Sequence, residues 1–393
     1  MAGMFFSCTK DSTLTDAEEL SLKSAPITVA LTPMEQLGKH LYFDKISTPN
    51  SMACADCHKA SVGFTGATPG INIHGSVYRG ADAQNFGDRK PPSAAYATYS
   101  EVLHREEDGT FEGGMFWDGR ATGERLGSPA AEQALGPFLN PAEHNLKSKL
   151  EVLQKIAKSN YISMWKEVFD NAFVYGTDAE INKTYDQAGL AIAAYEGSGE
   201  VNQFSSKFDY VMKGMAEFTE QEAWGLELFE GKGKCAQCHP TTFDDDMDLV
   251  LFTDYTYDNL GVPKNLQNPV YKYNPDFVDK GLGGFLATQE KWKMYADENM
   301  GKQKVPTLRN VDKRPGLGFT KAYTHNGYFK SLKEVVHFYN TRDVEGALWP
   351  DPEYADNIND SELGNLGLTD AEEDALVAFM GTLSDGYQVK LKK

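Results

Sequence analysis

The sequence predicts a mainly α-helical protein made of two related helical domains with long ordered loops. Two short segments that open with the same helix-start signal recur in the two halves of the chain. Residues 145–195 carry apolar side chains at helical spacing. Residues 61–120 and 240–290 are rich in Gly, Pro, Asn, Asp and Tyr without periodicity, as in long ordered loops.

The repeated segments begin at Thr32 and Thr219. A Glu follows each Thr at the spacing of a capping box, in which the two side chains satisfy free N–H groups at the start of a helix. In both segments a Gly and then a Leu follow at matching positions, and a loop leads into a cysteine motif. Two such signals in register indicate duplication of one helical unit. The matching residues are Glu35, Gly38 and Leu41 in the first segment, and Glu222, Gly225 and Leu228 in the second.

The domain organisation follows from this repeat. We expect a tail over residues 1–25, one domain over 26–200 and a second over 201–393, whose last residues pack back on the first. The Gly- and Ser-containing stretch at 196–204 marks the boundary. A further capping box at Thr369 predicts a helix that runs to about Leu383.

The two cysteine motifs carry the clearest chemistry. Both read C-x-x-C-H, the attachment signature of a c-type haem, with the last residue as an iron ligand. The alternatives are a zinc site split over the two cysteine pairs, or a redox dithiol, and neither requires the histidine. We therefore predict two covalently bound c-type haems and two cytochrome c-like domains. The motif residues are Cys54, Cys57 and His58 in the first copy, and Cys235, Cys238 and His239 in the second.

Composition excludes some functions. The net charge of −19 argues against a nucleic-acid partner. No apolar run approaches the ~20 residues of a membrane-spanning helix. The fifth cysteine, Cys8, follows a short apolar stretch that resembles the end of a bacterial lipoprotein signal; the alternative is an incidental thiol in a tail. Because bacterial C-x-x-C-H motifs mature beyond the inner membrane, we expect a periplasmic protein, with Cys8 as a candidate lipid anchor.

Three further strings flank the haem motifs in order: residues 116–120 (FWDGR), 305–310 (VPTLRN) and 325–327 (HNG). Together with the motifs they resemble the bacterial dihaem cytochrome c peroxidase superfamily, which includes MauG. The resemblance covers about residues 30 to 385. It implies an oxidoreductase whose first haem reacts with peroxide and whose second haem is low-spin and transfers electrons.

At the first haem, the resemblance implies His58 as proximal ligand and Glu143 as the catalytic acid–base residue. A carboxyl group over an apolar haem face would have a raised pKa suited to proton relay. The alternative is a solvent-facing Glu at a helix start. Gln133 and Pro137 match the distal positions of MauG-like members. His74 lies in a glycine-containing loop, where many relatives carry a histidine that caps the oxidised iron; the alternative is a surface histidine.

At the second haem, His239 is the proximal ligand and the position of the sixth ligand is Tyr339. Typical peroxidases of the family have Met there, whereas Tyr is the MauG-type residue. No Met occurs between Met300 and Met380. The alternative is a buried core tyrosine on a helix capped by Ser331. A phenolate favours Fe(III), whereas a thioether favours Fe(II), so the ligand decides how the second haem shares oxidising equivalents.

The resemblance also implies roles between and around the haems. Trp117 matches the tryptophan that lies between the two haems; the alternative is a buried core residue. Arg120 and Arg309 are candidates to bind haem propionates, against ordinary salt bridges. A calcium ion would use backbone oxygens near Lys304 and Pro306, but Lys90 stands where an Asn ligand is expected.

Two functions follow. The first is a peroxidase that reduces hydrogen peroxide with electrons from a small cytochrome c or a cupredoxin. The alternative is a MauG-like oxidase that uses peroxide to oxidise Trp or Tyr side chains of a partner protein. A third reading, a dihaem electron carrier, conflicts with an open first haem. The resemblance leaves a homodimer open.

Overall fold

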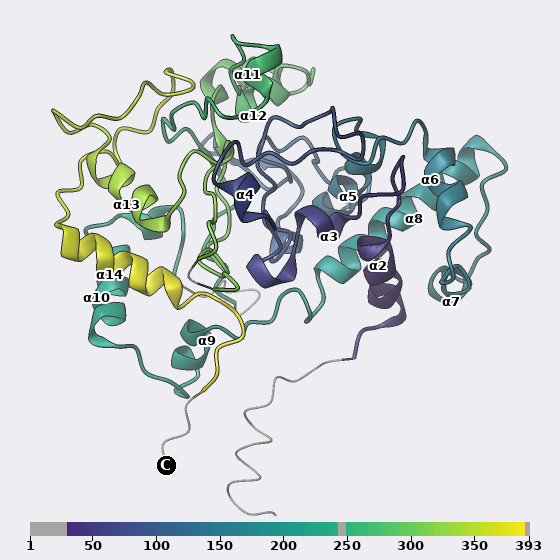
Figure 1. The fold of residues 1–393 in the computed structure, drawn as a ribbon, viewed down its shortest axis with the longest axis horizontal. Helices are drawn as coiled ribbons and strands as arrows, with labels where there is room; N and C mark the ends of the chain where they lie inside the picture. The colour runs from purple at the N-terminus through teal and green to yellow at the C-terminus, as the bar shows by residue number, and fades with distance from the viewer. Residues whose placement is uncertain (1–29, 243–248, 317, 390–393) are drawn as a thin grey trace, which may run out of the picture.

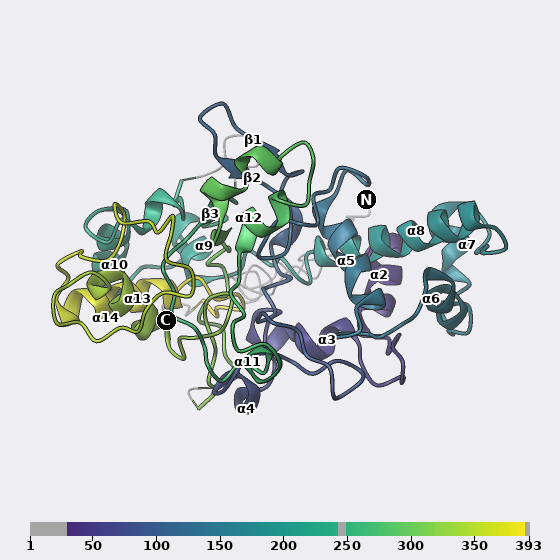
Figure 2. The same cartoon turned by 90° about the horizontal axis from the view of Figure 1, so that it is seen from above.

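The computed structural model describes residues 30–242, 249–316 and 318–389, and the predicted tail with Cys8 lies outside them. The helices form two groups that lie side by side (Figures 1 and 2). We refer to residues 30–204 as the N-terminal half and to residues 205–389 as the C-terminal half. The described part of the chain is helical with only four short strands, so the predicted mainly α class is confirmed.

The N-terminal half contains most of the long helices. Its elements are α2 (Pro33–Phe43), α3 (Cys54–Cys57), η1 (Ala60–Val62), α4 (Pro69–Asn72), η2 (Ala97–Tyr99), β1 (His104–Arg105), β2 (Phe111–Glu112), α5 (Pro129–Leu139), α6 (Lys149–Ile156), α7 (Met164–Phe169) and α8 (Asp178–Glu196). Residues between α4 and α5 are mainly loop, as predicted, with one β-hairpin in which His104 pairs with Glu112.

The C-terminal half repeats the plan with one α-helix fewer among its described residues. Its elements are α9 (Lys207–Met212), α10 (Glu220–Glu230), η3 (Cys235–Gln237), β3 (Tyr257–Asp258), α11 (Val270–Tyr273), α12 (Gly281–Leu286), η4 (Lys293–Tyr295), η5 (Asp297–Asn299), β4 (Gln303–Lys304), α13 (Leu332–Thr341) and α14 (Asp370–Gly381). Strands β3 and β4 are antiparallel, with Tyr257 opposite Lys304.

The predicted helix starts are confirmed. Thr32 caps α2 and Thr219 caps α10, each in a reciprocal capping box with the Glu three residues on. Thr369 caps α14 and Ser331 caps α13 in the same way. These boxes satisfy N–H groups that the first helical turn leaves free, which fixes where each helix begins.

The repeated glycines explain how each half is assembled. A Cβ on Gly38 would lie 1.8 Å from the Ala191 carbonyl oxygen, and one on Gly225 would lie 2.0 Å from that of Ala375. Helix α2 therefore crosses α8, and α10 crosses α14, with backbones in contact at a residue that has no side chain. Figure 1 shows the second pair at the left of the molecule. Each crossing anchors a separate apolar core.

The end of the chain returns to the N-terminal half. The carboxylate of Asp385 accepts hydrogen bonds from the Tyr96 hydroxyl and from the Asn310 side chain, each at 2.8 Å. Asp385 thus joins the two halves after α14 has ended. The contact links the two halves near the end of the described chain, while the domain division, with its boundary near residue 200, stays a prediction.

Candidate haem sites and the space between them

The first cavity lies in the N-terminal half and encloses about 1210 Å³, its open mouth included. Cys54, Cys57 and His58 line it. The His58 Nδ1 atom is 3.1 Å from the Phe64 carbonyl oxygen, so Nδ1 carries the hydrogen and donates it. Burial lowers the pKa of His58, which keeps the ring neutral. A neutral imidazole with its Nδ1 engaged has Nε2 available for a metal, as a proximal ligand requires.

The second cavity repeats this arrangement and encloses about 1430 Å³ with its mouth. Cys235, Cys238 and His239 line it, and His239 Nδ1 lies 2.8 Å from the Phe252 carbonyl oxygen. The two cysteine pairs line different cavities, so they do not form one split zinc site. The cavities instead provide one C-x-x-C-H motif each, as a dihaem protein requires.

Both carbonyl acceptors belong to phenylalanines with left-handed backbone. Phe64 has φ +56° and Phe252 has φ +53°. Such angles are uncommon for a residue with a large side chain and store strain that the surroundings must offset. Here they turn a carbonyl toward the histidine in each half. Sequence reasoning missed these positions, because Phe gives no signal for positive φ.

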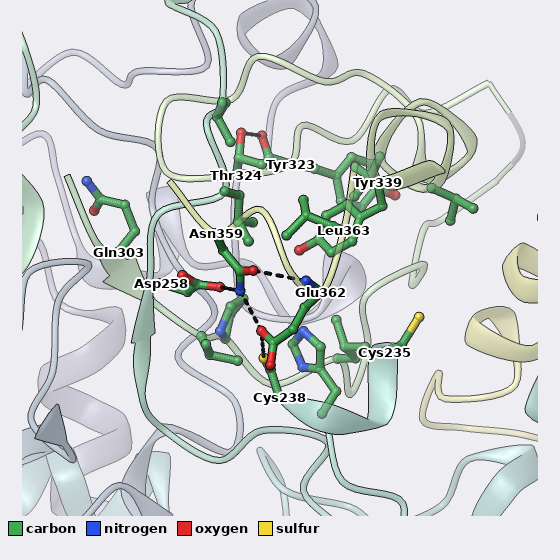
Figure 3. A pocket seen from close by; sticks show the side chains of 18 of the residues that line it. Cys235, Cys238, Asp258, Gln303, Tyr323, Thr324, Tyr339, Asn359, Glu362 and Leu363 are labelled. Carbon is green, nitrogen blue, oxygen red and sulfur yellow. Dashed lines mark hydrogen bonds between the residues drawn. The ribbon is translucent and has the colours of Figure 1, made fainter. Parts of the chain in front are cut away.

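The residues of the second cavity fit a haem. Its wall is mainly apolar, which suits the porphyrin face, and Cys235 and Cys238 lie across it from Tyr339 (Figure 3). The side-chain amide of Gln303 lines this cavity, and both of its polar atoms are buried without a partner among the described residues. A haem propionate would accept a hydrogen bond from that amide. Gln303 was not predicted from the sequence.

A polar cluster stands at the edge of the second cavity. Asn359 donates to Asp258 at 2.6 Å and hydrogen-bonds Glu362, which lies beside Cys238 (Figure 3). Burial raises the pKa of Asp258. Two carboxyl groups near one haem edge would stabilise positive charge on that haem.

Glu143 is half-buried and lines the first cavity. Its Oε1 atom accepts a hydrogen bond from Asn140 at 2.8 Å, and burial raises the pKa of Glu143. Gln133 and Pro137, on α5, line the same cavity. The structure therefore brings the predicted distal residues together with the His58 motif. Their catalytic roles stay predictions.

The two other histidines considered near this cavity differ in position. His144 lines the cavity and is buried, with Nδ1 2.7 Å from the Ile46 carbonyl oxygen. Burial lowers the pKa of His144, so it is neutral. His74 is exposed, does not line the cavity, and has Nδ1 3.0 Å from Gln267 Oε1. In this conformation His74 does not cap the first site.

Tyr339 reaches into the second cavity from α13 (Figure 3). Its hydroxyl makes no hydrogen bond to another described residue, and burial raises the pKa of Tyr339. A core tyrosine normally satisfies its hydroxyl, so the interpretation as a plain core residue is the weaker one. A ferric haem would stabilise the phenolate, because a bound cation reverses the effect of burial.

Trp117 lines both cavities. Its indole N–H donates to the Lys90 carbonyl at 2.9 Å, and its own carbonyl accepts from the Lys304 backbone N–H at 2.8 Å. These hydrogen bonds to Lys90 and Lys304 fix the position of Trp117. The predicted position between the two haem sites therefore matches the structure.

The two arginines predicted to bind haem propionates lie in different surroundings. Arg120 lines the first cavity, with one ion pair to Asp118 at 2.7 Å. Arg309 lines neither cavity. It forms a buried ion pair with Asp209 and donates from Nε to the Val250 carbonyl. A guanidinium committed in this way fits the salt-bridge interpretation, so Arg309 does not support a propionate role.

Two buried lysines, Lys90 and Lys304, lie in the region where the resemblance places a calcium ion. Lys304 Nζ donates to the carbonyls of Gly113 and Tyr255, at 2.6 and 2.8 Å. Lys90 Nζ donates to Thr65 Oγ1 and to the Pro91 carbonyl, each at 3.1 Å. Burial lowers the pKa of Lys304 to about 7 and that of Lys90 to about 8. A lysine Nζ atom donates hydrogen bonds to carbonyl oxygens and does not ligate calcium, so these side chains do not fit the ion.

Comparisons with known proteins agree with this geometry. Residues 32–217 match the family described as di-haem cytochrome c peroxidase. The methylamine utilization protein MauG of Paracoccus denitrificans is 33% identical over 362 residues, which cover 89% of this chain and 88% of that protein. The chain belongs to the dihaem cytochrome c peroxidase and MauG family, a family of haem oxidoreductases.

Two further relatives span the same length. The cytochrome-c peroxidase IdrP2 of Denitromonas iodatirespirans is 27% identical, with coverage of 89% of this chain and 81% of that protein. The crystal structure of the dihaem peroxidase BthA from Burkholderia thailandensis superposes with a TM-score of 0.75 at 30% identity, covering 93% of this chain and 90% of that one. The predicted family and the two-site fold are thus confirmed.

Proposed function

We propose that this protein is a c-type dihaem peroxidase that reduces hydrogen peroxide to water with electrons from a small periplasmic cytochrome c or cupredoxin. The first cavity carries this proposal, because it joins the Cys54–His58 motif to the half-buried carboxyl group of Glu143. Haem bound there would supply the iron at which peroxide is reduced. Thioether bonds from the four motif cysteines would attach the two haems.

Glu143 would move the proton. Its Oε1 atom is held by Asn140, so Oε2 is the oxygen that can take a proton from one peroxide oxygen and give it to the other. The raised pKa of Glu143 makes its carboxylate a stronger base than that of an exposed glutamate, which favours taking the proton from peroxide before passing it on. Gln133 would orient the peroxide by a hydrogen bond.

Electrons would pass through the second site and Trp117. The indole borders both cavities, so one electron-transfer step from either haem would reach Trp117. The oxidation of two donor molecules for each peroxide, measured with reduced cytochrome c or cupredoxin, tests this function. Peroxide turnover that leaves both reduced donors unchanged would contradict it.

A second candidate is a peroxide-dependent oxidase of Trp or Tyr side chains in a partner protein. Tyr339 in the second cavity favours it, because a phenolate ligand stabilises oxidised haem. The relative MauG also supports this candidate. The two functions differ in the reductant consumed: a small redox protein in the first, side chains of a protein substrate in the second.

The cellular setting follows from the cofactor. We place the protein in the periplasm because C-x-x-C-H motifs mature there, with Cys8 as the proposed lipid anchor and a homodimer as the proposed assembly. Among the described residues, no helix is long and apolar enough to span a bilayer. We propose two haems and no calcium, since Lys90 and Lys304 provide ammonium groups in the region expected for the ion.

A further inference from the structure

A carboxyl group without a partner lies in the wall of the first cavity. Glu196 is the last residue of α8, is 6% exposed and lines this cavity. Its carboxyl group makes no hydrogen bond or ion pair with any residue that the structure describes, and only its backbone carbonyl accepts a bond, from Asn202. Burial raises the pKa of Glu196 to about 8. An unpaired buried charge is costly, so this side chain is neutral in the chain alone.

The surroundings of Glu196 contain ionisable groups but no counter-ion. The nearest are Tyr42 on α2, Cys54 on α3 and Tyr195 on α8 itself, and burial keeps all three neutral because it raises the pKa of each. Cys54 would lose its titrating proton altogether on forming a thioether. None of the charged residues that line the same cavity forms an ion pair with Glu196. They are Arg79, Asp88, Arg89, Lys90, Arg120 and Glu143.

The internal repeat shows that packing does not require a carboxyl group here. Gly38 packs against Ala191 and Tyr195, while Gly225 packs against Ala375 and Phe379 in the same relative positions. The residue after Tyr195 in α8 is Glu196, and the residue after Phe379 in α14 is Met380. Each of the two lines the cavity of its own half. The same fold position therefore holds Met at the second site. The carboxyl group at the first site calls for a chemical explanation.

We propose that Glu196 is the group that takes up a proton when the haem of the first cavity is reduced and releases it when that haem is oxidised. This inference rests on the haem assigned to that cavity under the proposed function. On reduction, one electron enters the haem from the donor protein and one proton enters the carboxylate from solvent. On re-oxidation by the oxidised form of the donor protein, the electron returns to that protein and the proton returns from the carboxyl group to solvent.

Electrostatics gives the reason for this coupling. An oxidised haem carries one more positive charge than a reduced one, and a positive charge stabilises a nearby carboxylate. In a water-poor cavity wall the interaction is weakly screened. Reduction therefore raises the proton affinity of Glu196. Met380 offers the second haem no carboxyl group at the equivalent position, although Asp258 and Glu362 line that cavity, so the second haem shows the pH dependence expected without a group at this position.

The test is a spectroelectrochemical titration of both haems in the holoprotein over a pH series from about 6 to about 9. In the natural chain, the midpoint potential of the first haem falls as pH rises, because the carboxylate stabilises the oxidised state. Glu196→Gln and Glu196→Met make this fall shallower, while Glu143 and Lys90 in the same cavity keep their contribution. Met is the second variant because Met380 shows that the fold accepts it. Glu200→Gln is the matched control, since Glu200 is half-exposed and paired with Lys39 at 2.6 Å.

A reciprocal variant and a haem count complete the design. Met380→Glu should steepen the fall of the second haem's midpoint potential with rising pH relative to the natural chain. Equal slopes for the natural chain and both Glu196 variants, with two haems in every sample, would overturn the role of Glu196 and leave the proposed function intact. A sample of the natural chain with a single haem would contradict the proposed function and this inference together. Peroxide turnover does not enter the measurement.

Discussion

Replacement of Glu143 by Gln removes the proposed proton relay while it preserves the shape of the first cavity. Gln has the same length and keeps an oxygen that can accept the hydrogen bond from Asn140, which is 2.8 Å long in the structure. The only function lost is the ability of Oε2 to accept and donate a proton. General acid–base catalysis contributes about 10²–10⁴-fold, so kcat/KM for peroxide should fall by about that factor, or by about 3–5 kcal/mol of transition-state stabilisation.

The assay is steady-state oxidation of a reduced small cytochrome c or cupredoxin by hydrogen peroxide. Cyanide binding to the oxidised first haem, measured on the same samples, reports access to the cavity independently of proton transfer. Glu167→Gln, at an exposed position of α7, is the matched control. A Glu143→Gln variant that loses less than tenfold, with cyanide affinity unchanged, would refute the relay.

The pH dependence of the same reaction has a defined sign. Burial raises the pKa of Glu143, so the carboxyl group is protonated at pH values where an exposed glutamate is ionised. The relay begins when the carboxylate accepts a proton from peroxide, so the activity is present above this raised pKa and is lost as pH falls through it. The Gln variant should lack that limb of the profile.

Three further predictions concern other parts of the molecule. Tyr339→Met should raise the midpoint potential of the second haem in a spectroelectrochemical titration, because a thioether favours Fe(II); an unchanged potential would show that residue 339 does not bind the iron. Gly225→Ala should destabilise the C-terminal half by at least the about 1–3 kcal/mol typical of overpacking, since its Cβ would meet a backbone oxygen at 2.0 Å; thermal unfolding checks this against Gly199→Ala, where no atom lies within 4 Å. A calcium chelator should leave the haem spectra and the thermal midpoint unchanged, whereas Lys304→Met should lower the midpoint because two buried carbonyls lose their donor; dependence on added calcium would contradict this.

Local signals in the sequence predicted the helix starts and the haem motifs well. A capping box uses side chains only three residues apart, so Thr32 and Thr219 identify their helices without knowledge of the fold. The glycines at 38 and 225 were found as part of the repeat, but their purpose became clear only when the crossing helices were seen. That contact joins residues far apart in the chain.

Other features depend on tertiary placement that composition does not encode. Arg309 matched a propionate-binding position by resemblance, yet a buried carboxylate from α9 takes its guanidinium. The orphaned amide of Gln303 gives no sequence signal, because its environment comes from several loops. Glu196 could have been found by extending the repeat through Ala191 and Ala375, since the residues at the matching position differ in chemistry between the halves.

The most direct test of the central claim is to mix fully oxidised holoprotein with one equivalent of hydrogen peroxide and follow the haem spectrum in a stopped-flow instrument. In the structure His74 is exposed and contacts Gln267, so His74 does not cap the first site. We predict a rapid spectral change at the first haem without prior reduction. Absence of reaction until one electron is added would show that a protein ligand closes the first iron, and it would contradict an open first cavity as the site of peroxide reduction.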